Sequence, residues 1–315
     1  MTSASPSRIV FIDVDGTILE HGSVIAPSTV TAIRTARANG HLVYLCTGRS
    51  AGDVHPDVLA IGFDGAITNG GALATRGDEV LVSHPMPRAD VERLADYFTS
   101  RGIEYFLQTD EHVYASAGIF AMMAEFARLR AERRAEDLRH LGLTNTDAGA
   151  ADDLLDAVMA DATNRYLPLA QADLDAVAKA VFVSERSDGV DRAQRDLVDR
   201  FHVTPGSMPL PGGSNGEISL AGVTKGAAIL EVLAHLGRSP EEAVGIGDSW
   251  NDVEMFEVCG TAIAMSTSFV VRVGDSARGA WTHRSRAAAP MRTIGSERTR
   301  ARSSRTSTTS TGTSC

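Results

Sequence analysis

The chain has 315 residues, of which 43% are hydrophobic, and its 40 acidic and 30 basic side chains give a net charge of −10. This composition excludes a disordered chain, and the acidic balance argues against nucleic acid as a partner. The length suits two domains, and no run approaches about 18 apolar residues, so we expect neither a membrane span nor a membrane partner.

The first part of the chain alternates apolar runs with helical patterns. Buried strands are predicted at three apolar runs, Ile9–Ile12, Leu42–Cys46 and Ala66–Ile67. Helices are predicted at Ser28–Asn39, where Asn39-Gly40 is a stop signal, and near Asp53–Ala60. This β-α-β-α-β order predicts parallel strands that are joined by right-handed crossovers, as in a doubly wound sheet.

The middle of the chain has a different character. Ala72–Thr75 and Glu79–Ser83 predict a hairpin around Arg76-Gly77-Asp78. Beyond it, the predicted elements are helices at Ala89–Ser100 and Ile119–Leu141, strands at Glu104–Leu107 and His112–Ala115, and a strand-helix-strand passage over Ala157–Ser184. This mixed order predicts an inserted α+β domain.

The doubly wound pattern is expected to return near Glu217–Leu220. The elements predicted after it are a helix at Val223–Leu236, a short turn at Ser239–Glu242, a strand at Ala243–Ile246, a helix at Asp252–Val258 and a strand at Thr261–Met265. We therefore expect an α/β fold with a doubly wound parallel-sheet core at residues 1–83 and 212–270. The inserted domain is placed at 84–211, and an atypical, disordered tail rich in Arg, Ser and Thr is placed at 271–315.

Two carboxylates follow the first predicted strand directly. Asp13 and Asp15 come after an uninterrupted apolar run and before Gly16-Thr17. Turns are rich in Asp without any chemistry, but two neighbouring carboxylates at the end of a buried strand are costly unless a cation compensates them. Hard oxygen ligands of this kind favour a Mg²⁺ site.

A second acidic group follows the strand predicted at Ala243–Ile246. Asp248, Asn251 and Asp252 fall within one helical turn of the end of that strand. A helix cap explains one such residue, but three polar groups are more than a cap needs. Because ligands in open α/β sheets bind at the carboxyl ends of the strands, we expect both acidic groups to form the floor of one active site.

Two further motifs suit a phosphate. Thr47-Gly48-Arg49 follows the strand at Leu42–Cys46, where a hydroxyl and the N–H groups of a helix N-terminus can bind an anion. The alternative is an ordinary strand-to-helix turn. Lys225 lies near the start of a predicted helix, where it either faces the sheet edge and neutralises a phosphate or is a solvated surface lysine.

The order of these four elements resembles the haloacid dehalogenase superfamily of phosphohydrolases. The strand end Thr68-Asn69-Gly70, the stretch from Glu217 to Gly226 and the insert before it resemble the Cof-type branch, which carries a large α/β cap of type IIB. The resemblance covers about residues 7–265. It implies a haloacid dehalogenase-like core with the inserted domain as a cap that closes over the active site and selects the leaving group.

The resemblance also implies catalytic roles. Asp13 would be the nucleophile that forms an aspartyl-phosphate, and Asp15 would protonate the leaving oxygen and then activate water. The presence of Asp15 argues against the dehalogenase branch, where no proton is needed. Thr47 and Lys225 would hold the phosphoryl oxygens.

Binding roles follow from the same resemblance. Mg²⁺ would be bound by Asp13, Asp248 and the main-chain carbonyl of Asp15, with Asp252 as a further metal-site residue. Asn251 and Asp252 would orient the phosphate, the ion or Lys225. The remaining candidates for phosphate or substrate contact are Gly48, Arg49 and Asn69.

The function expected from the resemblance is a Mg²⁺-dependent phosphatase of small phosphorylated metabolites, such as sugar phosphates. A phosphomutase uses the same residues and stays an alternative, as does a catalytically impaired protein that only binds.

The three cysteines, Cys46, Cys259 and Cys315, have neither disulfide nor zinc spacing. We therefore expect a cytoplasmic protein, as a monomer or a homodimer.

The end of the chain departs from the family pattern. Members usually continue after the strand at Ala262–Met265 with a Gly-Asn-Ala-like turn, an acidic helix and a last strand. Here Ser266-Thr267-Ser268 follows, and the rest of the chain has nine arginines against two acidic residues. We hypothesise a shifted reading frame or a divergent terminus; an unambiguous in-frame gene sequence together with a detected Cys315 peptide would refute the frameshift.

Overall fold

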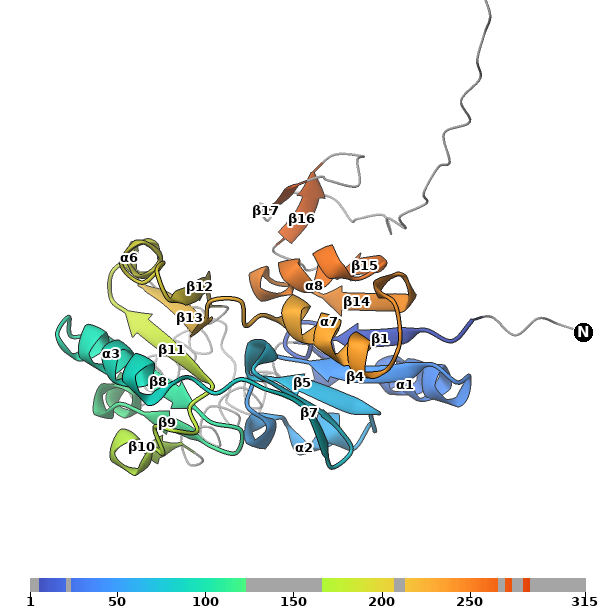
Figure 1. Ribbon diagram of the computed structural model, residues 1–315, viewed down its shortest axis with the longest axis horizontal. Helices are drawn as coiled ribbons and strands as arrows, with labels where there is room; N and C mark the ends of the chain where they lie inside the picture. Colours follow the sequence, from blue (N-terminus) through green and yellow to red (C-terminus); the bar gives the residue numbers. More distant parts are fainter. Residues whose placement is uncertain are drawn as a thin grey trace, which may run out of the picture.

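The computed structural model describes residues 6–20, 24–122, 166–206, 213–265, 270–273 and 280–283. Two sheets of different character dominate these residues (Figure 1). We call the seven-stranded one the core sheet and the six-stranded one the cap sheet. Among the described residues, no helix is both long and apolar enough to cross a membrane.

The core sheet has the order expected of a doubly wound fold. From one edge to the other its strands are β15 (Thr261–Ala264), β14 (Ala243–Gly247), β1 (Ile9–Ile12), β4 (Leu42–Cys46), β5 (Gly65–Thr68), β6 (Leu73–Arg76) and β7 (Glu79–Ser83). The first five are parallel, and β6 and β7 continue the sheet as the predicted antiparallel hairpin. The predicted α/β class and the doubly wound core are confirmed.

Helices cover both faces of the core sheet, as the alternation of side chains along its strands requires. Ile9 and Phe11 of β1 face α7 (Lys225–His235) and α8 (Val253–Val258). Ile12 faces the other way, where α1 (Pro27–Ala38) and α2 (Pro56–Leu59) pack. The shorter 3₁₀ elements of this part are η1 (Ala51–Asp53), η2 (Asn69–Gly71), η5 (Pro240–Glu242) and η6 (Trp250–Asp252).

The cap sheet is largely antiparallel and forms the second lobe of Figure 1. Its order is β10 (Leu167–Pro168), β9 (Val113–Ala115), β8 (Glu104–Gln108), β11 (Lys179–Ser184), β13 (Ser214–Leu220) and β12 (Phe201–Pro205). The helices α3 (Arg88–Thr99) and α6 (Gly189–Asp196) pack on one face around Phe98 and Phe182, which are fully buried. The 3₁₀ element η4 spans Leu169–Gln171.

Two sequence-based expectations for this lobe are wrong. The strand at Glu217–Leu220 does not mark the return to the core, because β13 pairs with β11 and β12 in the cap sheet. The limit predicted at residue 212 therefore falls inside that sheet. The helix expected before β11 is not found at residues 166–178, which hold β10 and a 3₁₀ turn instead.

Other expectations lie partly outside the described residues. The helix predicted at Ile119–Leu141 is present over its first described residues, since 117–122 are helical, and its remainder falls outside the described ranges. Two small hairpins complete the described part, β2–β3 (Leu19–Glu20, Val24–Ile25) and β16–β17 (Val270–Val273, Ala280–His283). The second hairpin contradicts the expectation of disorder for those few residues of the tail.

The turn after β1 requires a glycine for two separate reasons. Gly16 has a φ of +89°, a region that side chains with a Cβ adopt only with strain. A Cβ at this position would also lie 2.2 Å from Oδ2 of Asp248, at the end of β14. This close approach brings the loop after β1 against the loop after β14.

Gly16→Ala and Gly77→Ala separate these two reasons. Gly77, in the β6–β7 turn, also has a positive φ of 56°, but a Cβ there meets nothing within 4 Å. Both variants should lose about 1–2 kcal/mol of unfolding free energy from backbone strain. Gly16→Ala should lose about 1–3 kcal/mol more from overpacking against Asp248. Urea unfolding measures both; equal losses would contradict the close approach.

Candidate active site

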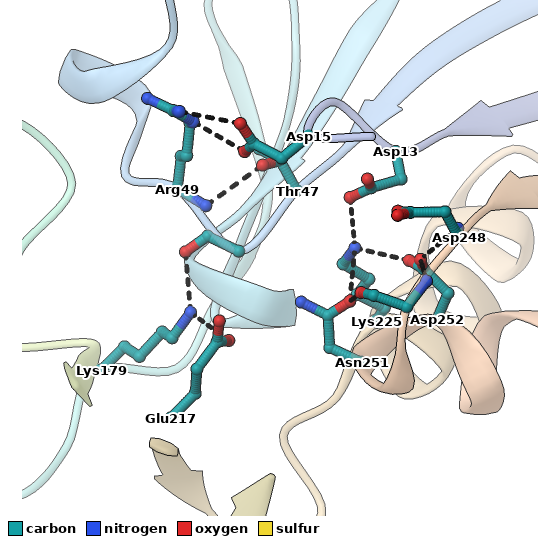
Figure 2. A network of polar contacts seen from close by, with 12 residues as sticks. Asp13, Asp15, Thr47, Arg49, Lys179, Glu217, Lys225, Asp248, Asn251 and Asp252 are labelled. Atoms are coloured by element: carbon teal, nitrogen blue, oxygen red, sulfur yellow. Dashed lines mark hydrogen bonds and ion pairs between the residues drawn. The ribbon is translucent and has the colours of Figure 1, made fainter. Parts of the chain in front are cut away.

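Three carboxylates from two neighbouring strand ends meet at the carboxyl edge of the core sheet. Asp13 follows β1, and its N–H continues the sheet ladder by donating to the carbonyl of Ile246 on β14 at 2.9 Å. Asp248 and Asp252 follow β14 in the next loop. All three are buried, and one oxygen of each lies within 4.8 Å of the others (Figure 2).

Lys225 supplies a positive charge to this cluster. It is the first residue of α7, whose start is fixed by Thr224, because the Thr224 hydroxyl accepts a hydrogen bond from the Ala227 N–H. The Lys225 ammonium is 1% exposed and donates to Asp13 Oδ1 and Asp252 Oδ1, both at 2.6 Å. An ammonium is unfavourable at a helix N-terminus, so these carboxylates are what hold it there.

The charges of the cluster do not balance. Burial raises the pKa of Asp13 well above its usual value, and the charges of Asp252 and Asp15 add to this while Lys225 opposes it. Burial, together with repulsion from Asp252, raises the pKa of Asp248 to about 7. Burial alone would lower the pKa of Lys225, but Asp13 and Asp252 raise it well above normal. One ammonium beside three carboxylates leaves an excess of negative charge.

The donor set fits a hard divalent cation. Carboxylate oxygens are the ligands that Mg²⁺ prefers, and a divalent ion would cancel the negative charge that Lys225 leaves uncompensated. Asp13 and Asp248 are the members that best suit this role. Both oxygens of Asp252 already accept hydrogen bonds, Oδ1 from Lys225 and Oδ2 from the N–H groups of Asp248 and Ser249 at 2.9 and 3.0 Å.

Asp252 therefore shapes the loop after β14. With Ser249 it forms a capping box that opens η6, so the helix-cap interpretation of this motif holds alongside the charged cluster. Gly247 makes room for it, because a Cβ there would lie 2.5 Å from the Asp252 carboxylate. Asn251 Oδ1 accepts from Lys225 at 3.3 Å and from the Ser249 hydroxyl at 2.7 Å, which places Asn251 beside the cluster.

Thr47 lies at the end of β4, next to the cluster. It is buried, its N–H donates to the Ile67 carbonyl on β5, and its hydroxyl accepts from the Arg49 N–H at 3.1 Å. The helix predicted near Asp53–Ala60 is present as α2 (Pro56–Leu59), but the element that directly follows the Thr47-Gly48-Arg49 turn is the three-residue η1. The helix N-terminus predicted as an anion site is therefore absent here, and the groups left for an anion are the hydroxyl and the N–H groups of the turn.

Asp15 and Arg49 face each other rather than the acidic cluster. The Arg49 guanidinium binds both oxygens of Asp15, at 2.7 and 2.8 Å (Figure 2). It also donates to the Asp53 carboxylate at 3.2 Å. The Asp15 carboxylate is thus not one of the three clustered acids. The metal contact expected of the Asp15 main-chain carbonyl stays a prediction. Arg49 orients Asp15 instead of standing free for a substrate.

Asn69 also has a role that sequence reasoning did not predict. It is fully buried, with a φ of 51°, and its amide donates to Asp110 Oδ1 at 3.1 Å. Asp110 follows the cap strand β8, and its carbonyl accepts from the N–H of Gly52 at 3.1 Å. Asn69 therefore joins the core to the cap rather than pointing into the site.

A pocket lies between the two sheets beside Lys225. Residues from both lobes line it: Gly70, Lys179, His202, Thr204, Glu217, Ser219, Val223, Thr224, Lys225, Asn251 and Glu254. Sequence reasoning missed Lys179, which is 3% exposed at the start of β11. A lysine that begins the apolar run Ala180–Val183 is a signal for a buried charge with a partner, and that signal was available in the sequence.

Comparisons with known proteins agree with this architecture. A family model described as haloacid dehalogenase-like hydrolase matches residues 10–269. The 5-amino-6-(5-phospho-D-ribitylamino)uracil phosphatase YwtE of Bacillus subtilis (strain 168) is 27% identical over 268 residues, which span 83% of this chain and 88% of that protein. The pyridoxal phosphate phosphatase YbhA of Escherichia coli (strain K12) is 25% identical over 270 residues, spanning 83% and 89%.

A solved structure gives the same fold. The sugar phosphatase BT4131, of haloacid dehalogenase subclass IIB, has a TM-score of 0.60 at 19% sequence identity and covers 83% of this chain and 88% of its own. The family model includes the strands from β1 to β15 almost entirely and all the carboxylates described above. The resemblance drawn from the sequence is thereby confirmed, and the chain belongs to the haloacid dehalogenase-like hydrolases, as a phosphatase of the Cof-type branch.

Proposed function

We propose that this phosphatase is Mg²⁺-dependent and hydrolyses small phosphorylated metabolites, such as sugar phosphates, through an aspartyl-phosphate at Asp13. One observation carries the proposal. A nucleophilic carboxylate, an ammonium and two further carboxylates are gathered and buried at the carboxyl edge of the core sheet. A phosphate monoester brings negative charge, so it needs both the ammonium and a metal cation to enter this site.

The reaction proceeds in two balanced steps. A carboxylate oxygen of Asp13 attacks phosphorus, the ester P–O bond breaks, and the leaving oxygen takes a proton from Asp15. Asp15, now ionised, then takes a proton from water as the water oxygen attacks phosphorus. The bond to Asp13 breaks, phosphate leaves, and both side chains return to their starting states.

Arg49 sets a condition for the first step. The Arg49 guanidinium donates to both oxygens of Asp15, at 2.7 and 2.8 Å, and a guanidinium can accept no hydrogen bond in return. Proton donation therefore requires these bonds to loosen when the leaving group arrives. In the second step the same two bonds hold the Asp15 carboxylate in place while it takes the proton from water.

The remaining residues bind and orient the phosphoryl group. Lys225 neutralises one of its oxygens, while the Thr47 hydroxyl and the N–H group of Gly48 donate to the others. Asp13, Asp248 and the main-chain carbonyl of Asp15 would hold Mg²⁺, which when bound supplies positive charge to the phosphoryl oxygens. Asn251 and Asp252 keep Lys225 in place.

The pocket lining supports a small, polar leaving group. It includes the hydroxyls of Thr204 and Ser219 and the ion pair of Lys179 with Glu217, which are polar groups. The named relatives act, by their names, on a phosphorylated ribitylamino uracil and on pyridoxal phosphate. We extend only the shared class, small phosphorylated metabolites, to this chain.

Other expectations also stay proposals. The buried thiols of Cys46 and Cys259 are unpaired, which is consistent with the cytoplasm. A monomer or homodimer is proposed for the assembly. The division into a core, a cap insert and a tail is also proposed, with the return to the core after Leu220 rather than at residue 212.

Asp13→Asn tests the proposed nucleophile. The amide cannot form the covalent intermediate, so kcat for p-nitrophenyl phosphate with Mg²⁺ should fall at least about 10³-fold. EDTA should abolish the activity of the unchanged chain. Asp199→Asn is the matched control, because Asp199 is an exposed carboxylate of the cap lobe, 62% accessible, and should leave kcat unchanged. Mg²⁺-dependent turnover that survives Asp13→Asn would refute the assignment.

Metal binding can be tested without turnover. Mg²⁺ at about 100 times its Kd should stabilise the folded chain by about 2.7 kcal/mol, seen as a rise in unfolding temperature over an EDTA sample. Asp248→Asn should remove most of that rise. Without metal this variant should be no less stable than the parent, because it removes a buried carboxylate whose pKa is raised to about 7 by burial and by the charge of Asp252. Asp175→Asn, exposed in the cap lobe, is the control; an equal Mg²⁺ effect in all three chains would contradict the site.

A further inference from the structure

Two charged residues of the cap sheet reach the phosphate-side turn of the core. Lys179 begins β11 and is 3% exposed; its ammonium donates to the Gly48 carbonyl at 2.9 Å and to Glu217 Oε2 at 2.5 Å. Gly48 belongs to the turn that follows β4 in the core sheet. A buried lysine from the cap thus binds the main chain of the core's Thr47-Gly48-Arg49 turn (Figure 2).

The register of the cap sheet explains why Lys179 and Glu217 act together. Glu217 of β13 pairs with Val181 of β11 in an antiparallel ladder. Lys179 lies two residues from Val181 and therefore on the same face of the sheet, on the diagonal from Glu217, where long side chains can meet. Burial alone would raise the pKa of Glu217, but Lys179, together with Lys225 and Asn251, lowers that pKa, so Glu217 is ionised.

Side chains of the cap and of the candidate active site lie close together around Gly48. A Cβ at Gly48 would lie 2.9 Å from the Lys179 ammonium, 3.3 Å from Glu217 Oε2 and 3.5 Å from Asn251 Nδ2. The Asn251 amide group also favours the ionised form of Glu217. Since Asn251 accepts from Lys225 at 3.3 Å, polar contacts run without a break from the cap sheet to the ammonium at Asp13.

We propose that Lys179 and Glu217 are positioning residues that make the phosphate-binding turn and Asn251 depend on contact with the cap. The proposal rests on the phosphatase function proposed above. Lys179 holds the Gly48 carbonyl and thereby orients the neighbouring Thr47 hydroxyl and Arg49, which in turn holds Asp15. Glu217 binds the Lys179 ammonium and also the amide group of Asn251, whose Oδ1 accepts from Lys225.

The bonding of the pair favours positioning over substrate contact. Glu217 Oε2 is occupied by Lys179, and two of the three ammonium protons of Lys179 go to protein acceptors. A substrate group would have to displace these bonds inside a buried site. Positioning and substrate contact predict different kinetics. Loss of a positioning residue slows the hydrolysis of every phosphate substrate, whatever its leaving group. Loss of a contact residue affects only those substrates whose leaving group reaches the pair.

The decisive variants are Lys179→Met, Glu217→Gln and their double combination. Kinetics are measured with Mg²⁺ on acetyl phosphate, which has a small leaving group, and on p-nitrophenyl phosphate. Positioning predicts that kcat falls about 10- to 100-fold on both substrates with little change in KM. Arg93→Met is the matched control, since Arg93 pairs with Asp199 on the exposed surface of the cap lobe and should leave kcat unchanged.

The double variant separates positioning from stability. Each single variant leaves one buried charge without its partner and should lower the unfolding temperature. The double variant removes both charges, so it should regain stability while its kcat stays as low as in the single variants. A kcat that recovers together with stability would overturn the positioning role. An increase in KM on p-nitrophenyl phosphate alone would also overturn it and assign the pair to substrate contact.

A readout without turnover keeps the positioning role distinct from the proposed function. The Arg49 N–H donates to the Thr47 hydroxyl, and the Gly70 N–H donates to the Thr47 carbonyl at 3.0 Å. Hydrogen exchange of these two amides should be faster in Lys179→Met than in the parent or in Arg93→Met. Unchanged exchange would refute the positioning role even in an active enzyme. Faster exchange in Lys179→Met, found together with a parent chain that hydrolyses neither substrate, would refute the phosphatase proposal and leave the coupling of cap and turn standing.

Discussion

The structure depends on the burial of three carboxylates beside a single ammonium. Asp13, Asp248 and Asp252 meet because β1 and β14 are neighbours in a parallel sheet and end at the same edge. Lys225 offsets only part of their charge, and burial raises the pKa of both Asp13 and Asp248 in response. A site with such an excess of negative charge is unfavourable alone and favourable with a divalent cation. This is the physical reason for the proposal that it is a metal-assisted phosphoryl-transfer centre.

Much of the core could be predicted from the sequence because its signals are local. Ile9–Ile12, Leu42–Cys46 and Ala243–Gly247 are short apolar runs that end in polar groups, and parallel buried strands have that pattern. Their carboxyl ends must meet at one edge, so the clustering of Asp13 with Asp248 followed from topology alone. For Lys225 the sequence predicted only a place near the start of a helix and left its direction open; the structure places it at the first residue of α7, against Asp13 and Asp252.

The errors arise where the partner of a residue lies far away in the chain. Glu217–Leu220 reads as a strand in either sheet, and only its pairing with β11 and β12 assigns it to the cap. Arg49 and Asn69 have the chemistry of ligand-binding groups, but Asp15 and Asp110 occupy them. Lys179 at the start of an apolar run signals a buried charge, but it belongs to no recognised motif. Its partners, the Gly48 carbonyl and Glu217, are set by how the two lobes meet, so the sequence alone does not identify them.

The most direct test of the account is to map the covalent intermediate. The chain is mixed with acetyl phosphate and Mg²⁺, quenched in acid before the steady state, digested, and each peptide is weighed by mass spectrometry. The account predicts one phosphoryl group on the peptide that contains Asp13, located at that side chain by fragmentation, and none in samples with EDTA. Turnover with the phosphoryl group on another residue, or with no phosphorylated peptide at any time before the steady state, would contradict it.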